Sequence, residues 1–267
     1  MSVQTLYTAA TGMQALQTKL EVIANNLANV NTTGFKKGRA NFEDLFYRKE
    51  QIPGAQDSAG NPTPTGTLIG LGTRVSSVQT NFTQGAFELT NRPLDLAIEG
   101  NGFLQVNDPS GNTVYTRAGN LSINANGQLV VGSANTGRVV QPAITIPQDA
   151  TEISISAEGV VMYRQSGSQT LQQAGTLELA IFQNPEGLMK LGENLYTTTD
   201  ASNQAVTGTP GQNGLGFIRQ GALEASNVEP VQELIDLITT QRSFELNSQT
   251  VQAGDQILQL VANLRRF

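Results

Sequence analysis

The sequence predicts an α+β protein with long, coiled-coil-like helices at its N- and C-terminal ends and a mainly antiparallel β-rich domain between them. In the first thirty residues, apolar positions recur at alternating steps of three and four, the period of a helix that packs lengthwise on another helix. A second pattern of this kind begins near residue 228. Between the two, apolar and polar residues alternate and turn residues separate the runs, which is typical of strands joined by hairpins. We expect the two terminal helices to pack together.

The predicted N-terminal helix carries a narrow apolar seam and very little charge. Lys19 and Glu21 are the only charged residues between positions 1 and 30. A helix that lies alone on a protein surface normally turns a charged face to water, so we expect this one to be contacted on more than one side. The seam residues, spaced by three and four, are Leu6, Met13, Leu16, Leu20, Ile23, Leu27 and Val30, with Ala9 in the same register.

Four asparagines follow or flank the end of this seam. Asn25, Asn26 and Asn29 can offer amide donors and acceptors to neighbouring helices without the desolvation cost of a charge. Asn31 and Gly34 tolerate left-handed backbone geometry, and we expect the helix to stop there. A simpler interpretation is that all four asparagines only frame the end of the helix.

The predicted C-terminal helix has a clear start and a second narrow seam. Ser226 or Asn227 can cap it, Pro230 suits its first turn, and Glu229 and Glu233 favour the positive end of the helix dipole. A seam of two residues in seven does not hold a helix folded alone. We therefore expect the terminal helices to pair with each other, with other subunits, or with both. The seam residues are Leu237, Phe244, Val251 and Leu258.

The rest of the chain divides at changes of composition. Residues 48–73 are rich in proline and glycine, and we expect a long extended loop or arm. Lys36, Lys37 and Arg39 lie close to two acidic residues in the sequence, and we interpret them as a solvated surface. The predicted domains are an N-terminal helix (1–33), a connecting segment that carries the arm (34–74), a β-rich middle domain (75–222) and a C-terminal helix (223–267), and the resemblance described below implies that the β-rich domain is the outer one.

The composition excludes much of the usual catalytic chemistry. The chain has no cysteine and no histidine, which removes thiol nucleophiles, catalytic triads that use histidine, and imidazole or thiolate metal sites. The carboxylate pairs Asp95 with Glu99 and Glu152 with Glu158 fit exposed strand positions better than a glycosidase-like site. The net charge of −6 argues against nucleic acid as a partner. We expect no enzyme activity, no cofactor, no metal and no small-molecule substrate.

The N-terminus and the absence of cysteine also bear on export. The first residues lack the basic and apolar regions of a secretory signal, and no apolar run is long enough to span a bilayer. A chain without cysteine can cross a membrane unfolded without being oxidised. We expect no cleaved signal peptide.

Several motifs resemble the bacterial flagellar rod and hook axial proteins. These are "ANNLANVNTTGFKKGRANFEDL" near the N-terminus, "PLDLAIEGNGFLQV" in the middle and "GALEASNVEPVQELIDLITTQRSFELNSQTVQAGDQIL" near the C-terminus. The resemblance covers nearly the whole chain, and the two terminal motifs are highly specific. Its polar signature positions in this sequence are Asn25, Asn26, Asn29, Asn31, Gly34, Asn227, Gln241, Arg242 and Asn247.

The resemblance implies a structural subunit of the flagellar basal body. Such subunits leave the cell through the type III export apparatus and polymerise into a hollow helical drive shaft across the periplasm, with the terminal helices as its inner coiled-coil layer. The length and the arm favour the distal rod, which implies contacts with copies of itself, proximal rod proteins, the hook protein and the basal-body ring proteins. The alternatives are a proximal rod or hook protein of the same family, a secreted β-rich fibre or adhesin, and a cell-wall hydrolase.

Overall fold

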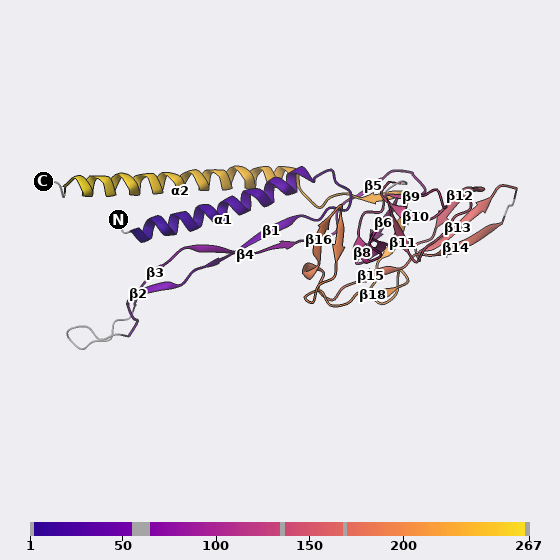
Figure 1. The fold of residues 1–267 in the computed structure, drawn as a ribbon, viewed down its shortest axis with the longest axis horizontal. Coiled ribbons are helices and arrows are strands. Elements are labelled where there is room, and N and C mark those ends of the chain that lie inside the picture. The colour runs from indigo at the N-terminus through magenta and orange to yellow at the C-terminus, as the bar shows by residue number, and fades with distance from the viewer. Residues whose placement is uncertain (1–2, 55–64, 134–136, 168–169, 265–267) are drawn as a thin grey trace. The chain divides into compact units, whose positions relative to one another are not determined.

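A computed structural model describes residues 3–54, 65–133, 137–167 and 170–264. The chain divides into two compact units (Figure 1). The first, the helical unit, contains Met1–Ala28, Gly38–Gln79 and Glu229–Phe267. The second, the β-rich unit, contains Asn29–Lys37 and Thr80–Val228. Residues 34–37 of the predicted connecting segment belong to the β-rich unit, and its later residues belong to the helical unit.

Two long helices, α1 (Val3–Ala28) and α2 (Pro230–Leu264), dominate the helical unit and lie side by side (Figure 1). They run antiparallel. A Cβ atom added to Gly254 on α2 would meet Leu6 of α1, and one added to Gly12 would lie 3.2 Å from Nδ2 of Asn247. Glycine at these two positions therefore lets the helices approach closely. Neither helix, over its described length, is long and apolar enough to cross a membrane.

The first helix ends earlier than the sequence predicts. It stops at Ala28, and the following residues turn because the Thr32 amide donates to the Asn29 carbonyl. Gly34, at a φ of +69°, then redirects the chain. Val30 consequently lies beyond the helix, in the β-rich unit, and does not extend the seam.

The strands of the helical unit form two ribbons. The predicted arm is more regular than expected, because β2 (Tyr47–Gln51) and β3 (Thr67–Gly70) pair antiparallel where the composition suggested an extended loop. Tyr47–Gln51 is exposed on every residue, so it lacks the alternation by which a strand is recognised in sequence. Residues 55–64 of the arm lie outside the described residues. The pairs are β1 (Gly38–Asp44) with β4 (Thr73–Thr80), and β2 (Tyr47–Gln51) with β3 (Thr67–Gly70).

The β-rich unit confirms the prediction of a middle region built from antiparallel strands. Its largest sheet follows the order β16-β17-β8-β7-β11-β10-β9, and β15 joins β7 to β18. These strands are β7 (Phe103–Asn107), β8 (Thr113–Thr116), β9 (Leu121–Ile123), β10 (Leu129–Val131), β11 (Arg138–Gln141), β15 (Leu179–Ile181), β16 (Met189–Gly192), β17 (Leu195–Thr197) and β18 (Val206–Gly208).

Smaller sheets and a short 3-10 helix complete this unit. The three-stranded sheet is β12 (Ala150–Ile155), β13 (Val160–Gln165) and β14 (Leu171–Thr176); the two-stranded sheets pair β6 (Leu96–Glu99) with β19 (Phe217–Gln220), and β5 (Phe87–Leu89) with β20 (Ala222–Glu224); the 3-10 helix is η1 (Pro185–Gly187).

Two clusters of apolar side chains fill the β-rich unit. The larger one joins the main sheet to the three-stranded sheet through fully buried residues such as Val106, Val161 and Leu179. The smaller one is aromatic, and its Tyr115 and Phe182 rings meet edge to face with centroids 4.8 Å apart. Its members are Phe103, Tyr115, Ala180, Phe182, Leu188 and Tyr196. The Arg117 guanidinium lies 5.8 Å from the centre of the Phe103 ring, which places a charge at the edge of this cluster.

Candidate functional site

The C-terminal helix exposes apolar side chains that α1 does not cover. Val231 is 71% exposed and Ile238 is 56% exposed, although both are large and apolar. The members at its start occupy positions i, i+3, i+4 and i+7 counted from Val231, so they share one face of the helix. Exposed apolar surface of this kind is typical of a site where another molecule packs. Its members are Val231, Leu234, Ile235, Ile238, Leu246, Ile257 and Leu260.

The β2–β3 ribbon presents a second exposed apolar surface. Phe46 is 88% exposed, and Tyr47, Ile52 and Leu68 are also largely open to solvent. A hollow of about 620 Å³ lies here, lined by Asp44, Leu45, Phe46, Tyr47, Lys49, Leu68 and Arg74. The helical unit thus carries unpartnered apolar surface on both its helix and its ribbon.

The predicted seam residues are covered to different degrees. Ile23 is buried, as are Ala9 and Ala15 on the same helix. The remaining helical seam positions are half-buried, so one more helix could still pack against them. These are Leu6, Met13, Leu16, Leu20 and Leu27 on α1, and Leu237, Phe244, Val251 and Leu258 on α2.

Asn26 is the signature asparagine that joins elements of the helical unit. Its Oδ1 accepts from the Gly38 amide at 2.9 Å, and its Nδ2 donates to the Gly38 carbonyl at 2.9 Å and to Oε2 of Glu233 at 3.2 Å. Asn26 and Glu233 are both buried. One amide therefore ties α1 to the start of β1 and to the first turn of α2, which gives the asparagine a role in packing.

The other signature positions have more varied surroundings. Asn29 accepts a hydrogen bond from the Thr32 hydroxyl at 3.1 Å, in the turn that follows α1. Asn247 is half-buried beside Gly12, and Arg242 pairs with Glu245 on the helix surface. The structure leaves Asn25, Asn31 and Gln241 exposed.

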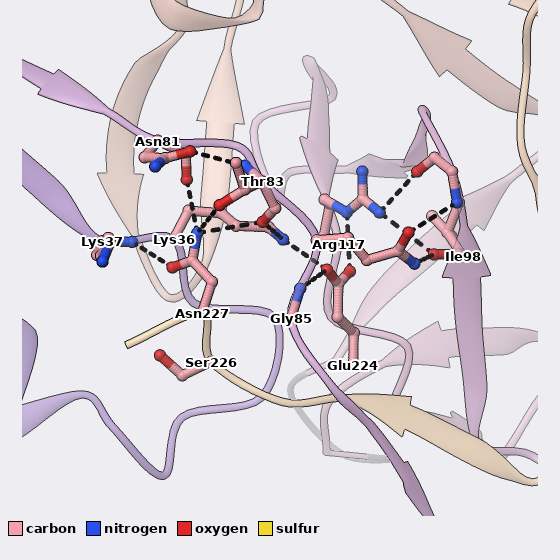
Figure 2. A network of polar contacts seen from close by, with 12 residues as sticks. Lys36, Lys37, Asn81, Thr83, Gly85, Ile98, Arg117, Glu224, Ser226 and Asn227 are labelled. Carbon is pink, nitrogen blue, oxygen red and sulfur yellow. Dashed lines mark hydrogen bonds and ion pairs between the residues drawn. The ribbon is translucent and has the colours of Figure 1, made fainter. Parts of the chain in front are cut away.

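A buried charged junction lies in the β-rich unit where segment 29–37 meets the end of β20 (Figure 2). Lys36 Nζ contacts Glu224 Oε1 at 2.5 Å, and Arg117 Nε donates to Glu224 Oε2 at 2.9 Å. The remaining donors reach backbone carbonyls, because Lys36 also donates to Thr83 and Arg117 to Ile98 and Gly100. Burial lowers the pKa of Lys36, the nearby Arg117 adds to this effect, and Glu224 opposes it.

This junction overturns one expectation. Lys36 is fully buried, so the interpretation of Lys36, Lys37 and Arg39 as a solvated surface is wrong for Lys36 and holds for the exposed Arg39. Sequence reasoning also missed Glu224 and Arg117. The alternation of side chains along β20 does contain a signal that Glu224 is buried. Glu224 is two residues after the buried Ala222, so both side chains point to the same, inner face of the strand.

The β16–β17 hairpin holds the same N-terminal segment from another side. Lys190 donates to the Lys36 carbonyl at 3.0 Å and lies 5.2 Å from the centre of the Phe35 ring. Asn194 donates to the Thr33 carbonyl at 3.0 Å. Burial lowers the pKa of Lys190. Segment 29–37 is therefore fixed to the β-rich unit along most of its length.

The candidate carboxylates have different surroundings, and the expectation of exposed positions is wrong for Asp95. Glu152 forms an exposed ion pair with Arg164 at 3.1 Å, and Asp95 is buried. In the described ranges, no group of three or more acidic side chains is placed to hold a metal ion. The geometry described so far consists of exposed apolar surfaces on the helical unit and a buried charged junction in the β-rich unit.

Comparison with known proteins identifies the family. Residues 6–36 match the family described as "Flagella basal body rod protein", residues 97–163 match "Flagellar hook protein FlgE/F/G D1 domain", and residues 219–264 match "Flagellar basal body rod FlgEFG protein C-terminal". The chain is 47% identical to a flagellar basal-body rod protein FlgG from Caulobacter vibrioides over 98% of this chain and 99% of the relative. It belongs to the FlgG family of flagellar basal-body rod proteins.

Other FlgG proteins match over similar lengths. The FlgG of Agrobacterium fabrum is 44% identical, with 95% of this chain and 96% of the relative covered. The FlgG of Buchnera aphidicola is 42% identical, with 97% and 98% covered. The resemblance seen in the terminal motifs is confirmed, and FlgG is a structural, non-enzymatic component of the basal-body rod.

Proposed function

We propose that this chain is the distal rod subunit, and that it polymerises into a hollow helical shaft that transmits motor torque to the hook. The observation that carries the proposal is the pair of antiparallel terminal helices with apolar side chains left exposed along α2. Identical subunits that bind head to tail without closing a ring form an open helical filament. Burial of the exposed row in such contacts supplies a driving force for assembly.

In this proposal α1 and α2 form the inner layer of the shaft and pack as a coiled coil with the helices of neighbouring subunits. The half-buried seam residues support this, because they retain area for a further helix. The low charge of α1 supports it as well, since uncharged amides let many copies pack closely without repulsion. The β-rich unit forms the outer layer.

The proposal extends to partners and location. We expect contacts with proximal rod proteins, the hook protein and the basal-body rings, and a position that spans the periplasm. We also expect export through the flagellar type III apparatus without a cleaved signal peptide. The cysteine-free composition is compatible with passage of an unfolded chain.

Electron microscopy of the purified chain at high concentration tests the assembly surface. Leu234→Glu on α2 and Leu171→Glu on β14 change leucines of similar exposure, 44% and 48%. We expect straight tubes from the wild-type chain and from Leu171→Glu, and monomers from Leu234→Glu. Tubes of normal yield from Leu234→Glu would remove α2 from the assembly surface.

A truncation tests the role of the terminal segments as a whole. A chain without residues 1–33 and 228–267 should remain monomeric under conditions in which the full chain forms tubes. If the truncated chain still forms tubes, the terminal helices do not drive polymerisation.

The arm is proposed to stiffen the shaft by bridging subunits. The exposed aromatic side chains of Phe46 and Tyr47 at its base support this role. Deletion of residues 48–73 should give a tube that bends more easily. An equally straight and rigid tube would count against the idea.

A further inference from the structure

Four peptide bonds connect the two units, between residues 28 and 29, 37 and 38, 79 and 80, and 228 and 229. We call each of these connections a crossing. Residues next to three of the four crossings are joined by the side chain of Asn227 (Figure 2). Asn227 lies just before the last crossing, Lys37 ends the segment before the second, and Asn81 follows the third. All the contacts described below lie within the β-rich unit.

Both the oxygen and the nitrogen of the Asn227 side-chain amide form hydrogen bonds. Its Oδ1 accepts from the Lys37 amide at 2.8 Å. Its Nδ2 donates to the Asn81 carbonyl at 2.9 Å and to the carbonyl and hydroxyl of Thr83, each at 3.1 Å. The Asn81 amide in turn donates to the Lys37 carbonyl at 2.9 Å, which closes a ring of hydrogen bonds through all three segments.

The ring is anchored on the charged junction. Lys36, next to Lys37, and Glu224, three residues before Asn227, form the buried ion pair, and Lys36 shares the Thr83 carbonyl with Asn227. The three segments therefore leave the β-rich unit from a fixed base.

We propose that Asn227 is a positioning residue that binds three of the four crossings into one joint, so that twist applied to the assembled helices reaches the β-rich unit through three coupled segments. This inference rests on the proposed function. Three separate linkers would each rotate about their own backbone dihedrals, and the hydrogen-bonded ring removes that freedom. The site needs one acceptor and two donors on one short side chain. Asparagine supplies them, whereas aspartate would turn oxygen towards two carbonyls.

Amide hydrogen exchange on the full-length monomeric chain tests the joint directly. The informative group is the Asn81 amide, because its partner is the Lys37 carbonyl and not Asn227 itself. In Asn227→Asp we expect exchange at the Lys37 and Asn81 amides to rise at least about tenfold, with core amides such as Val106 unchanged. Asn184→Asp is the matched control, because Asn184 Nδ2 donates to the Ala201 carbonyl at 3.1 Å away from any crossing.

Two exchange results would overturn the proposal. Unchanged exchange at Asn81 would show that Asn227 does not couple the crossings. An equal rise over the whole β-rich unit would show that it only stabilises the fold. Asn227→Ala removes the amide without adding charge and gives the same comparison if the aspartate variant does not fold.

Tubes assembled from the same variants supply the mechanical readout. We expect Asn227→Asp to form tubes in wild-type yield but with a shorter persistence length, and Asn184→Asp to match the wild type in both. Tubes of Asn227→Asp as stiff as wild type would overturn the mechanical role. If the wild-type chain forms no tubes, the proposed function fails, while the exchange result still decides whether Asn227 binds the crossings together.

Discussion

Nζ of Lys36 lies 2.5 Å from Oε1 of Glu224, and neither side chain is exposed to solvent. The two residues are 188 positions apart, so this contact joins the segment that follows the first helix to the segment that precedes the last. Arg117 takes the other carboxylate oxygen at 2.9 Å. One carboxylate thus neutralises part of the charge of two buried cations. Its removal should therefore lower the stability of the β-rich unit.

Glu224→Ala should strongly destabilise the β-rich unit. The substitution leaves Lys36 and Arg117 buried without their counterion, and loss of one partner from a buried pair typically costs about 3–5 kcal/mol. Denaturant unfolding followed by tyrosine fluorescence measures the change. Glu152→Ala is the control, because it breaks the exposed pair with Arg164 and should cost about 1 kcal/mol or less. Equal effects of the two substitutions would contradict a buried junction.

Tyr196 should make the β-rich unit lose stability above pH 10. Burial in the aromatic cluster raises the pKa of its hydroxyl from 10.0 to about 12. The folded state therefore keeps this proton after the unfolded state has lost it. The stabilisation is fully present below pH 10 and disappears as the pH rises through 12, a loss of about 2–3 kcal/mol. Tyr196→Phe should remove this part of the pH dependence in denaturant titrations.

The lowered pKa values of Lys36 and Lys190 have the opposite effect on stability at lower pH. Burial lowers the pKa of both ammonium groups below their usual 10.5. The folded state releases these protons first, so stability rises with pH up to about 10.5. The decline that Tyr196 causes should therefore be clearest above that value. Tyr163→Phe, a change on β13 outside the aromatic cluster, should leave the decline in place.

Gly34→Ala should loosen the N-terminal segment from the β-rich unit. The φ of +69° costs an alanine about 1–2 kcal/mol, and the new methyl group would lie 3.0 Å from the backbone at Arg117 and Ala118. Overpacking of this kind adds about 1–3 kcal/mol. Gly111→Ala is a matched control, since Gly111 has a φ of +83° in open space. If both variants unfold at the same denaturant concentration, the close approach at Gly34 has no energetic consequence.

Asn26→Asp should weaken the pairing of α1 with α2. The new carboxylate would face Oε2 of Glu233, now 3.2 Å from the amide, and would repel the Gly38 carbonyl. We expect the free energy of unfolding to fall by about 1–3 kcal/mol. Denaturant unfolding monitored by far-UV circular dichroism measures this change. Glu233→Gln in the same chain should restore part of it, because the like charge is removed. Strictly additive effects would show that the two side chains do not interact.

The terminal helices could be predicted from sequence because their pattern is local. A seam with a period of three and four appears in any window of the helix, and Pro230 marks the start of α2 directly. The helix end was predicted less well. Asn29 and Gly34 turn the chain by a local hydrogen bond and by backbone geometry. The helix therefore ends before Val30, although the apolar pattern of the sequence continues to that residue.

The charged junction and the Asn227 ring could not be predicted because their partners are distant in the sequence. Lys36 and Glu224 look like ordinary surface charges when each is considered with its neighbours. Only the fold shows that Arg117 pairs with Glu224 and that Lys36 also donates to the Thr83 carbonyl. Asn227 was recognised as a signature residue and as a possible helix cap, whereas its side chain bonds to Lys37 and Asn81.

Leu20→Asp should block assembly while the β-rich unit stays folded. Leu20 is half-buried on α1, and a carboxylate there would have to be desolvated when a neighbouring helix packs against the seam. We expect loss of swimming in cells that carry this variant and an unchanged denaturant midpoint for the β-rich unit. Leu191→Asp is the control, because Leu191 is 52% exposed on β16 and the substitution adds the same charge outside the helical unit. Normal motility of Leu20→Asp would exclude the α1 seam from the assembly surface.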